Sequence, residues 1–311
     1  MNLLPNSNFN FMNKTRLFFF TSLFLLISTV GLLTFKGINY GIDFSGGILI
    51  EVKVKDDVTI SDVRKKISSL KRFDSSLQEF GSSQDILIRS SVNDIELNQA
   101  VELIKNTINE QVVEFRRVEI VGPVIGEELK KYAFYAVIFA LLAMMMYIWI
   151  RFEWQYGVGA LIALFHDVLI TIGFVSLLDI EFGLSVLAAI LTIAGYSIND
   201  TVVIFDRVRE NFSKHKKKEY EEIFNLSINQ SLNRTIMTSL TTLVALITLY
   251  LFGGEVISGF TLAMIIGVVI GTYSSNFVAV PVLLLLKPNR GAIEEFIDPV
   301  KAKFFEKERN D

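Results

Sequence analysis

Cysteine is absent from the 311-residue sequence, so disulfide bonds, thiol catalysis and cysteine-ligated zinc are all excluded. Histidine occurs only twice, and we therefore expect no metal site built from the protein's own side chains. The net charge is −3, so the chain lacks the basic excess that is typical of nucleic-acid binding, and we expect no nucleic-acid partner. These absences remove several large classes of function.

Two common enzyme motifs are missing as well. The chain has no G-x-x-x-x-G-K-[ST] loop and therefore no recognisable means of using ATP or GTP. It has no H-E-x-x-H pair either, because His166 is followed by Asp167 and Val168. We expect neither an enzyme nor a protein that depends on a cofactor.

Apolar residues, by contrast, are abundant: 51% of the chain is hydrophobic while 20% remains charged. This mixture is typical of several membrane spans combined with a soluble domain. A bilayer core about 30 Å thick requires about 20 apolar helical residues. Segments of that length or nearly so occur at 17–35, 132–150, 156–178, 183–205, 235–252 and 260–286. We therefore predict an α-helical polytopic membrane protein with one span, a soluble domain, and five further spans within 129–286.

The first apolar stretch is too long for the core of a cleaved signal peptide, and no small-residue cleavage site follows it, so we expect a retained anchor. Basic residues precede the first span and follow the fourth and sixth spans, which places all three groups on one side of the membrane. That side should be the cytoplasm, with both the N-terminal segment 1–16 and the C-terminal tail 287–311. The basic run 214–218 is usually a topology signal; contact with anionic membrane lipids is the alternative.

Residues 36–128 form the only long outer segment and resemble a small α+β domain. The stretches 48–54, 76–80, 85–90 and 112–121 have the character of strands. Apolar residues at helical spacing predict helices over 61–70, with Thr59 or Ser61 as N-cap, and over 95–108. The order β-α-β-β-α-β predicts a ferredoxin-like domain.

Two opposite charges fall inside the predicted spans at similar depth. At 1.5 Å per residue, Asp200 in the fourth span lies about 24 Å from the outer boundary, and Arg234 at the start of the fifth lies about 27 Å from it. The two helices are consecutive and antiparallel, so the charges are able to pair, and Tyr196 precedes Asp200 by one turn on the same face. Burial favours the neutral acid and a nearby arginine favours the charged form, so a movable arginine would let Asp200 bind and release a proton. The alternative is a fixed structural contact, with Arg234 reaching the headgroups.

His166 and Asp167 lie about 15 to 17 Å from the inner end of the third span, near the membrane midplane. Ionisable groups at such depth cost about 2.5 to 3.5 kcal/mol each and normally mark ion paths or tight pairs. Both residues therefore join the candidate proton pathway; the alternative is a buried hydrogen-bonded pair that ties helices together. A stripe of small residues in the sixth span, Gly267, Gly271, Ser274 and Ser275, favours helix packing over a ligand site.

Five sequence blocks together resemble the SecD/SecF family of protein-export membrane proteins, and within it the SecF type. They are GIDFSGG at 41–47, VGPVIGEEL at 121–129, HD at 166–167, GYSINDTVVIFDRVREN at 195–211 and NQSLNRTIMTSLTTL at 229–243. No single block is decisive, but the set follows the order of the family along almost the whole chain. Without the family, the first block is a glycine-rich turn of unknown function.

The resemblance implies one half of a transporter of the resistance-nodulation-division type, with SecD, of the same one-plus-five layout, as the other half. It also implies association with the SecYEG channel and YajC, and use of the proton-motive force in late steps of polypeptide export across the bacterial inner membrane. The aspartate and arginine that the family uses in proton movement match Asp200 and Arg234. The single copy of the unit indicates a separate subunit and not a SecD–SecF fusion.

Two functions of other classes stay open. One is a proton-driven exporter of small molecules or lipids of the same superfamily, although such exporters usually have two large outer domains and twelve spans in one chain. The other is a scaffold that stabilises the channel without conducting protons. A scaffold predicts full activity for Asp200→Asn, whereas proton coupling predicts loss.

Overall fold

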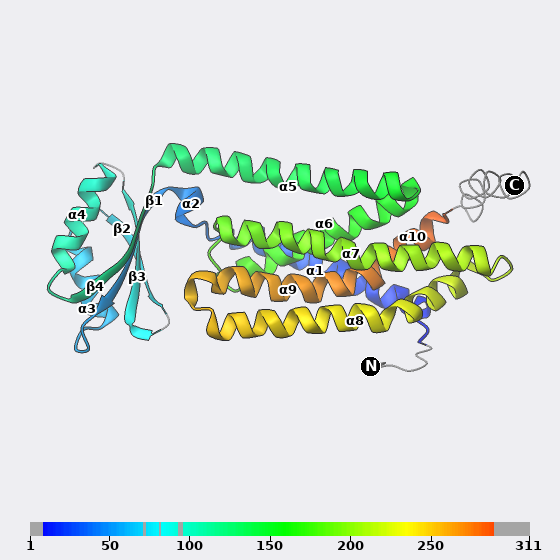
Figure 1. The fold of residues 1–311 in the computed structure, drawn as a ribbon. Helices are drawn as coiled ribbons and strands as arrows, with labels where there is room; N and C mark the ends of the chain where they lie inside the picture. Colours follow the sequence, from blue (N-terminus) through cyan, green and yellow to red (C-terminus); the bar gives the residue numbers. More distant parts are fainter. Residues whose placement is uncertain (1–8, 71–72, 81, 93–95, 289–311) are drawn as a thin grey trace, which may run out of the picture.

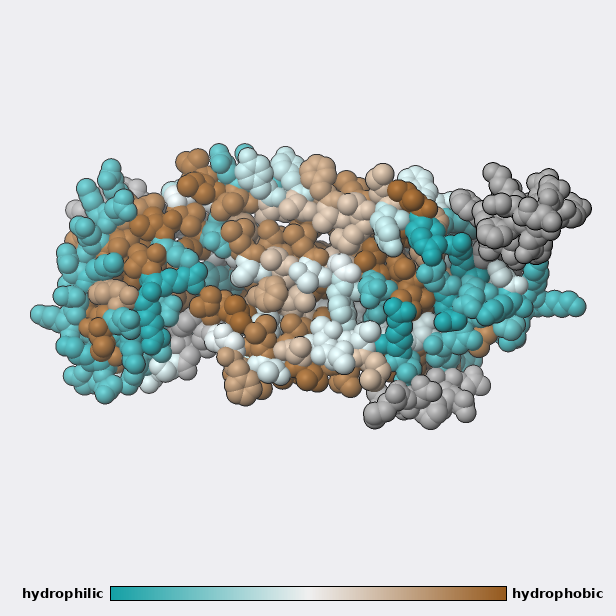
Figure 2. Space-filling model, viewed as in Figure 1, coloured by the Kyte–Doolittle hydropathy of each residue, from teal (hydrophilic) through white to brown (hydrophobic). Residues whose placement is uncertain are grey.

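The computed structural model describes residues 9–70, 73–80, 82–92 and 96–288. A small α+β domain lies at one end of a bundle of long helices (Figure 1). Apolar residues form a broad band over the bundle, and hydrophilic residues cover both ends of the molecule (Figure 2). A membrane that surrounds the middle of the bundle would produce this distribution.

In the described part of the chain, 6 helical segments are long and apolar enough to cross a membrane. They are Met12–Phe35, α5 (Pro123–Arg151), α6 (Trp154–Leu177), α7 (Leu184–Lys214), α8 (Tyr220–Phe252) and Ser258–Leu286. The first combines η1 (Met12–Lys14) with α1 (Thr15–Phe35). The last combines α9 (Ser258–Ser274), the π-helical segment η3 (Ser275–Ala279) and α10 (Val280–Leu286). The predicted class, one span followed by a domain and five spans, is confirmed.

Three helices extend beyond the apolar stretches that predicted them. α5 begins at Pro123, inside the range 36–128 assigned to the soluble domain; α7 continues to Lys214; and α8 begins at Tyr220. Hydropathy marks only the membrane-length part of a helix, whereas helical hydrogen bonding continues through polar residues into water. Proline suits the first position of α5 because the N–H that it lacks would have no partner there.

The soluble domain has the predicted element order. It contains β1 (Gly47–Val54), α3 (Ile60–Ser68), β2 (Phe73–Phe80), β3 (Ser82–Val92), α4 (Leu97–Ile108) and β4 (Val112–Val121). The antiparallel sheet has the order β2-β3-β1-β4, so the ferredoxin-like arrangement is confirmed. Thr59 is the N-cap of α3 and forms a capping box with Asp62. Of the two predicted N-caps, Thr59 and Ser61, the first is confirmed.

One face of the sheet carries the domain core. Ile48, Ile50 and Val52 of β1 are fully buried against α3 and α4, because every second residue of a strand points to the same side. The other face, which includes Leu49 and Arg89, lies toward the bundle (Figure 1). A short helix, α2 (Ile42–Ser45), lies where the sheet meets the helices.

The first described residues are held at the far end of the bundle. The Asn229 side chain of α8 accepts a hydrogen bond from the Phe9 N–H (2.9 Å) and donates one to the Phe9 carbonyl oxygen (2.8 Å). This end also carries the turn between α7 and α8 with the basic run 214–218. The predicted cytoplasmic tail falls outside the described residues from position 289 onward.

Candidate functional site

Asp200 lies on the buried side of α7 and is only 2% exposed. Its Oδ2 atom has no hydrogen-bond partner among the described residues. On the neighbouring helix α8, Arg234 is near enough to act on the charge of Asp200. Within the described chain, however, no ion pair of 4.0 Å or less joins Asp200 to Arg234. The predicted partners are therefore neighbours that do not form an ion pair.

Tyr196 lies one turn before Asp200 and is half-buried. Its hydroxyl donates to Oγ of Ser239 on α8 at 3.4 Å, and Ser239 shares a hydrogen bond of 2.6 Å with Thr272 on α9. Tyr196 thus links α7 to α8 and α9 beside the Asp200 site.

The threonine hydroxyls of α8 behave in two ways. Thr238, Thr241 and Thr242 donate to carbonyl oxygens of their own helix. Thr235 is fully buried, and its Oγ1 has no partner among the described residues. Asp200 Oδ2 and Thr235 Oγ1 are the buried side-chain atoms of α7 and α8 that the described structure leaves without a hydrogen bond. A proton can therefore bind Asp200 without breaking a hydrogen bond at Oδ2.

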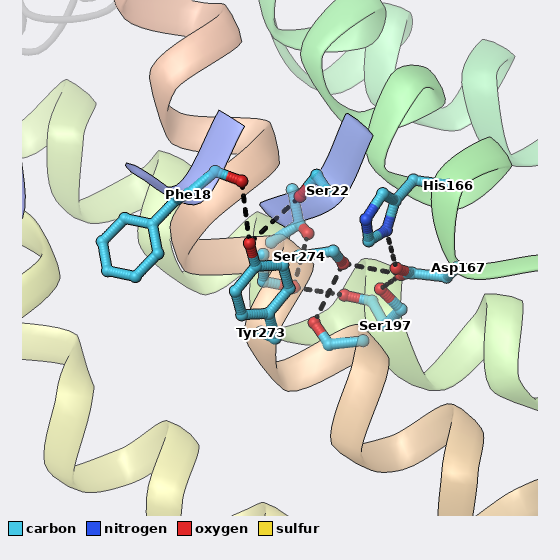
Figure 3. A network of polar contacts seen from close by, with 10 residues as sticks. Phe18, Ser22, His166, Asp167, Ser197, Tyr273 and Ser274 are labelled. Carbon is cyan, nitrogen blue, oxygen red and sulfur yellow. Dashed lines mark hydrogen bonds and ion pairs between the residues drawn. The ribbon is translucent and has the colours of Figure 1, made fainter. Parts of the chain in front are cut away.

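Asp167 of α6 has very different surroundings (Figure 3). Its Oδ1 is 3.0 Å from Nδ1 of His166, and its Oδ2 accepts hydrogen bonds from Ser197 of α7 (2.6 Å) and Ser274 of α9 (2.7 Å). Asp167 is fully buried and His166 is 2% exposed. Three polar contacts to one buried carboxyl group hold three helices together. These contacts favour the reading of His166 and Asp167 as a buried tie between helices.

The tie continues into the π-helical segment of the last span. The Ser275 hydroxyl is 2.9 Å from Oγ1 of Thr201 and donates to the carbonyl oxygen of Ser197 at 3.2 Å. Since Ser197 and Thr201 flank Asp200 on α7, the network fixes the turn of the helix that carries it. A π-helical turn often accompanies a functional site.

On its other side the network reaches α1. The Tyr273 hydroxyl donates to the carbonyl oxygen of Phe18 (3.0 Å), so Ser22 must donate to Tyr273 (3.0 Å) (Figure 3). The Tyr273 ring stacks on the imidazole of His166, with 6.1 Å between ring centroids. Nε2 of His166 is buried and has no hydrogen-bond partner in the described chain.

The structure thus sorts the predicted residues into two groups that belong to two different helix contacts of α7. Asp200, Arg234 and Tyr196 belong to the contact with α8, whereas His166 and Asp167 belong to the contact with α1, α6 and α9. Ser197, Thr201 and Tyr273 were not predicted, because they have no charge to mark them. The packing predicted for the stripe that contains Gly271, Ser274 and Ser275 is confirmed, because a Cβ on Gly271 would lie 3.0 Å from the Cβ of Ser197. Across the described residues no group of three or more metal-ligating side chains occurs.

Comparison with known proteins identifies the family. Residues 100–289 match the family described as "Protein export membrane protein SecD/SecF, C-terminal", and residues 31–58 match the "SecD/SecF GG Motif". The first match alone covers more than half of the chain. The chain belongs to the SecD/SecF family.

Curated members of the SecD/SecF family resemble the chain along nearly its full length. A protein translocase subunit SecF from Rickettsia rickettsii is 45% identical over 94% of this chain and 98% of its own. One from Desulfurispirillum indicum is 44% identical over 88% of each chain. The likeness therefore includes the soluble domain as well as the spans.

Solved SecDF structures share the fold. The chain matches SecDF from Thermus thermophilus with a TM-score of 0.82 and 36% identity, over 91% of this chain and 39% of that one. It matches SecDF in a form called super-membrane-facing with a TM-score of 0.68 and 35% identity, over 95% of this chain and 41% of that one. The chain thus spans about two fifths of the length of these proteins.

Proposed function

We propose that the chain is the SecF subunit of the protein translocase in the bacterial inner membrane. It pairs there with SecD, and the pair uses the proton-motive force to promote late steps of polypeptide export. The membership in the SecD/SecF family and the full-length likeness to curated SecF subunits support this proposal. Association with the SecYEG channel and YajC, and contact with membrane lipids, belong to the same proposal.

A single observation supports the proton coupling: Asp200 is buried, carries an oxygen with no partner among the described residues, and has Arg234 close by without an ion pair between them. Burial favours the neutral acid, and approach of the guanidinium group favours the charged acid. Arginine itself stays protonated, so it acts only by moving. Each small shift between α7 and α8 then changes the affinity of Asp200 for a proton. Tyr196 belongs to this site as the residue that ties α7 to α8 and α9.

The energy available is sufficient for such a device. One proton that crosses a potential of about 100 mV releases about 2.3 kcal/mol. That amount biases a two-state equilibrium by about 50-fold, since 1.4 kcal/mol corresponds to a factor of 10. Transfer of one proton per cycle would thus be enough to favour one arrangement of α7 and α8 over another.

His166 and Asp167 take a supporting part in the proposal. Their network with Ser197 anchors the turn of α7 that holds Asp200, so they position the proton-binding group. A direct place in the proton path, through the unpartnered Nε2 of His166, is the second role to test.

The exposed surface of the bundle supports the proposal that a partner chain binds there. In the described structure, only 11% of the apolar stretch of α5 and 17% of that of α8 are buried, whereas 61% of that of α6 is buried. Arg234 itself is exposed in the isolated chain. A second helical subunit against α7 and α8 would shield this charge from lipid, as a SecD half would do.

The decisive experiment measures proton-dependent export in inner-membrane vesicles that contain Asp200→Asn. The amide cannot exchange a proton, so we expect proton-dependent export to be lost while SecD still co-purifies. Arg234→Met should produce the same loss with assembly intact, because it removes the charge that modulates Asp200. The matched control is Asp206→Asn, which changes an acid of the same helix that is 46% exposed and pairs with Arg151.

Full proton-dependent export by Asp200→Asn would contradict the coupling and favour a scaffold. Failure of the chain to co-purify with any second six-span protein, together with loss of resistance to a small molecule in its absence, would favour an exporter of the same superfamily.

A further inference from the structure

The glycine-rich block 41–47 builds a joint between the soluble domain and the bundle. Its helix α2 packs against the first turn of α5 at a distance that only glycine permits. A Cβ on Gly126 would lie 2.9 Å from the carbonyl oxygen of Phe44, and a Cβ on Gly46 would lie 2.9 Å from Cα of Pro123. Any larger residue at either position would separate α2 from α5.

The other side of the joint is the loop between α6 and α7. The Gly41 N–H donates to the carbonyl oxygen of Phe182 (3.0 Å), and the Phe182 N–H donates to that of Asn39 (2.7 Å). The Phe182 ring lies near those of Tyr40 and Phe44, with centroid distances of 6.1 and 5.7 Å. Backbone pairing and aromatic contacts together join the two segments, which lie far apart in the sequence.

Asp43 completes the contact at the outer end of α7. Its Oδ2 accepts a hydrogen bond of 2.8 Å from the N–H of Leu184, the first residue of that helix. The N-cap position itself is Gly183, which has no side chain to supply. The first N–H groups of a helix have no partner within it, and a negative charge is favoured beside them. Asp43 thus caps α7 from a different part of the chain.

The sheet contributes a second contact to the same loop. Arg89 of β3 forms an ion pair with Glu181, and the two side chains are 16% and 27% exposed. Partly buried charges need matched partners, so this pair is satisfied only when the domain sits in one orientation on the loop.

From these contacts we infer that Asp43 is a positioning residue that couples the orientation of the soluble domain to the outer end of α7. α7 is the helix that carries Asp200, about halfway along its length. A tilt or shift of α7 is therefore transmitted through Asp43 and α2 to the sheet. The coupling itself is independent of the proposed function, but its consequence for export rests on that function.

The test uses the full chain in lipid nanodiscs and exploits its lack of cysteine. One spin label is placed on Asp57→Cys, in an exposed turn of the soluble domain, and the other on Ala188→Cys, on the exposed side of α7. The pair reports the distance between the soluble domain and α7. We expect one dominant, narrow distance peak for the parent chain. Asp43→Ala should lose that single peak, while Asp43→Asn should keep it, because the amide oxygen still accepts the Leu184 N–H.

Glu102→Ala, which removes an exposed acid on α4, is the matched control and should leave the peak unchanged. An unchanged peak in Asp43→Ala, or a parent chain without a dominant peak, would overturn the inference. The measured quantity is a distance and does not depend on export. Loss of proton coupling in Asp200→Asn would therefore leave the distance unchanged. Conversely, an unchanged distance in Asp43→Ala would not affect the role proposed for Asp200.

Discussion

At the scale of single residues, two buried aspartates on adjacent helices have opposite surroundings. Asp167 accepts hydrogen bonds from two hydroxyl groups and shares one with the imidazole of His166, whereas Asp200 keeps an oxygen with no partner in the described structure. A carboxyl group with partners on both oxygens is a stable anchor, and one with an unpartnered oxygen is able to accept a proton there. The contrast supports the proposal that Asp200 is the acid that binds a proton and Asp167 an anchor between helices.

This contrast predicts that Asp167→Asn is mainly a stability mutation. The asparagine Nδ2 cannot accept a hydrogen bond, so at least one of His166, Ser197 and Ser274 loses its acceptor in a buried site. We expect a loss of about 1 to 3 kcal/mol in unfolding free energy, seen as a lower melting temperature in detergent. Asp206→Asn serves as the exposed control. An unchanged melting temperature combined with lost proton transport would instead assign Asp167 to the proton path.

At the scale of elements, the loop between α6 and α7 holds an unusual acid. Burial raises the pKa of Glu181; the guanidinium group of Arg89 opposes this change, and the nearby charge of Asp43 adds to it. The raised pKa means that the folded chain binds a proton at Glu181 more tightly than the unfolded chain does. The ionised acid therefore costs stability at the joint, and Arg89 recovers only part of that cost.

We accordingly predict that stability falls as the pH rises from the ordinary range of glutamate, near 4.5, through the raised pKa. Glu181→Gln should flatten this part of the profile because the amide has no charge to bury. Melting temperatures in detergent between about pH 4 and pH 7 measure the effect. Glu102→Gln, an exposed change on α4, should keep the slope of the parent chain. A Glu181→Gln profile as steep as the parent profile would assign the slope to another group.

At the scale of the whole molecule, charge and apolar surface agree on one placement in the membrane. The domain lies beyond one end of the apolar band, and the basic turn between α7 and α8 lies beyond the other (Figure 2). Positive charge is retained on the cytoplasmic side. The soluble domain should therefore lie outside, and both ends of the chain should lie in the cytoplasm.

Cysteine labelling tests this orientation directly, because the chain has no cysteine of its own. A membrane-impermeant maleimide applied to spheroplasts, whose outer membrane is opened and whose inner membrane is intact, should label Asp57→Cys but not Lys216→Cys. Inverted vesicles should give the reverse pattern. Both positions are exposed and lie in turns outside the helices, where a maleimide has access to them. Labelling of Lys216→Cys from outside would contradict the predicted orientation.

The amount predictable from sequence differs between the elements and the site. The six spans and the β-α-β-β-α-β order follow from hydropathy and alternation, because burial in lipid or against one face of a sheet restricts residue type at each position. The ends of α5, α7 and α8 do not follow, since polar helical residues outside the membrane resemble those of loops. The charged residues Asp200, Arg234, His166 and Asp167 stand out only because lipid penalises them.

The sequence alone therefore determined the spans, the small domain and the depth of each buried charge, because these depend on the cost of placing each residue in lipid or in a core. Tertiary structure decided which groups meet. It placed Ser197 and Ser274 on Asp167 and set Asp43 at the start of α7. It also left one oxygen of Asp200, near Arg234, without a partner in the part of the chain that the structure describes. These pairings join residues far apart in the chain, and hydroxyl groups and glycines carry no pattern that reveals their partners before the helices pack.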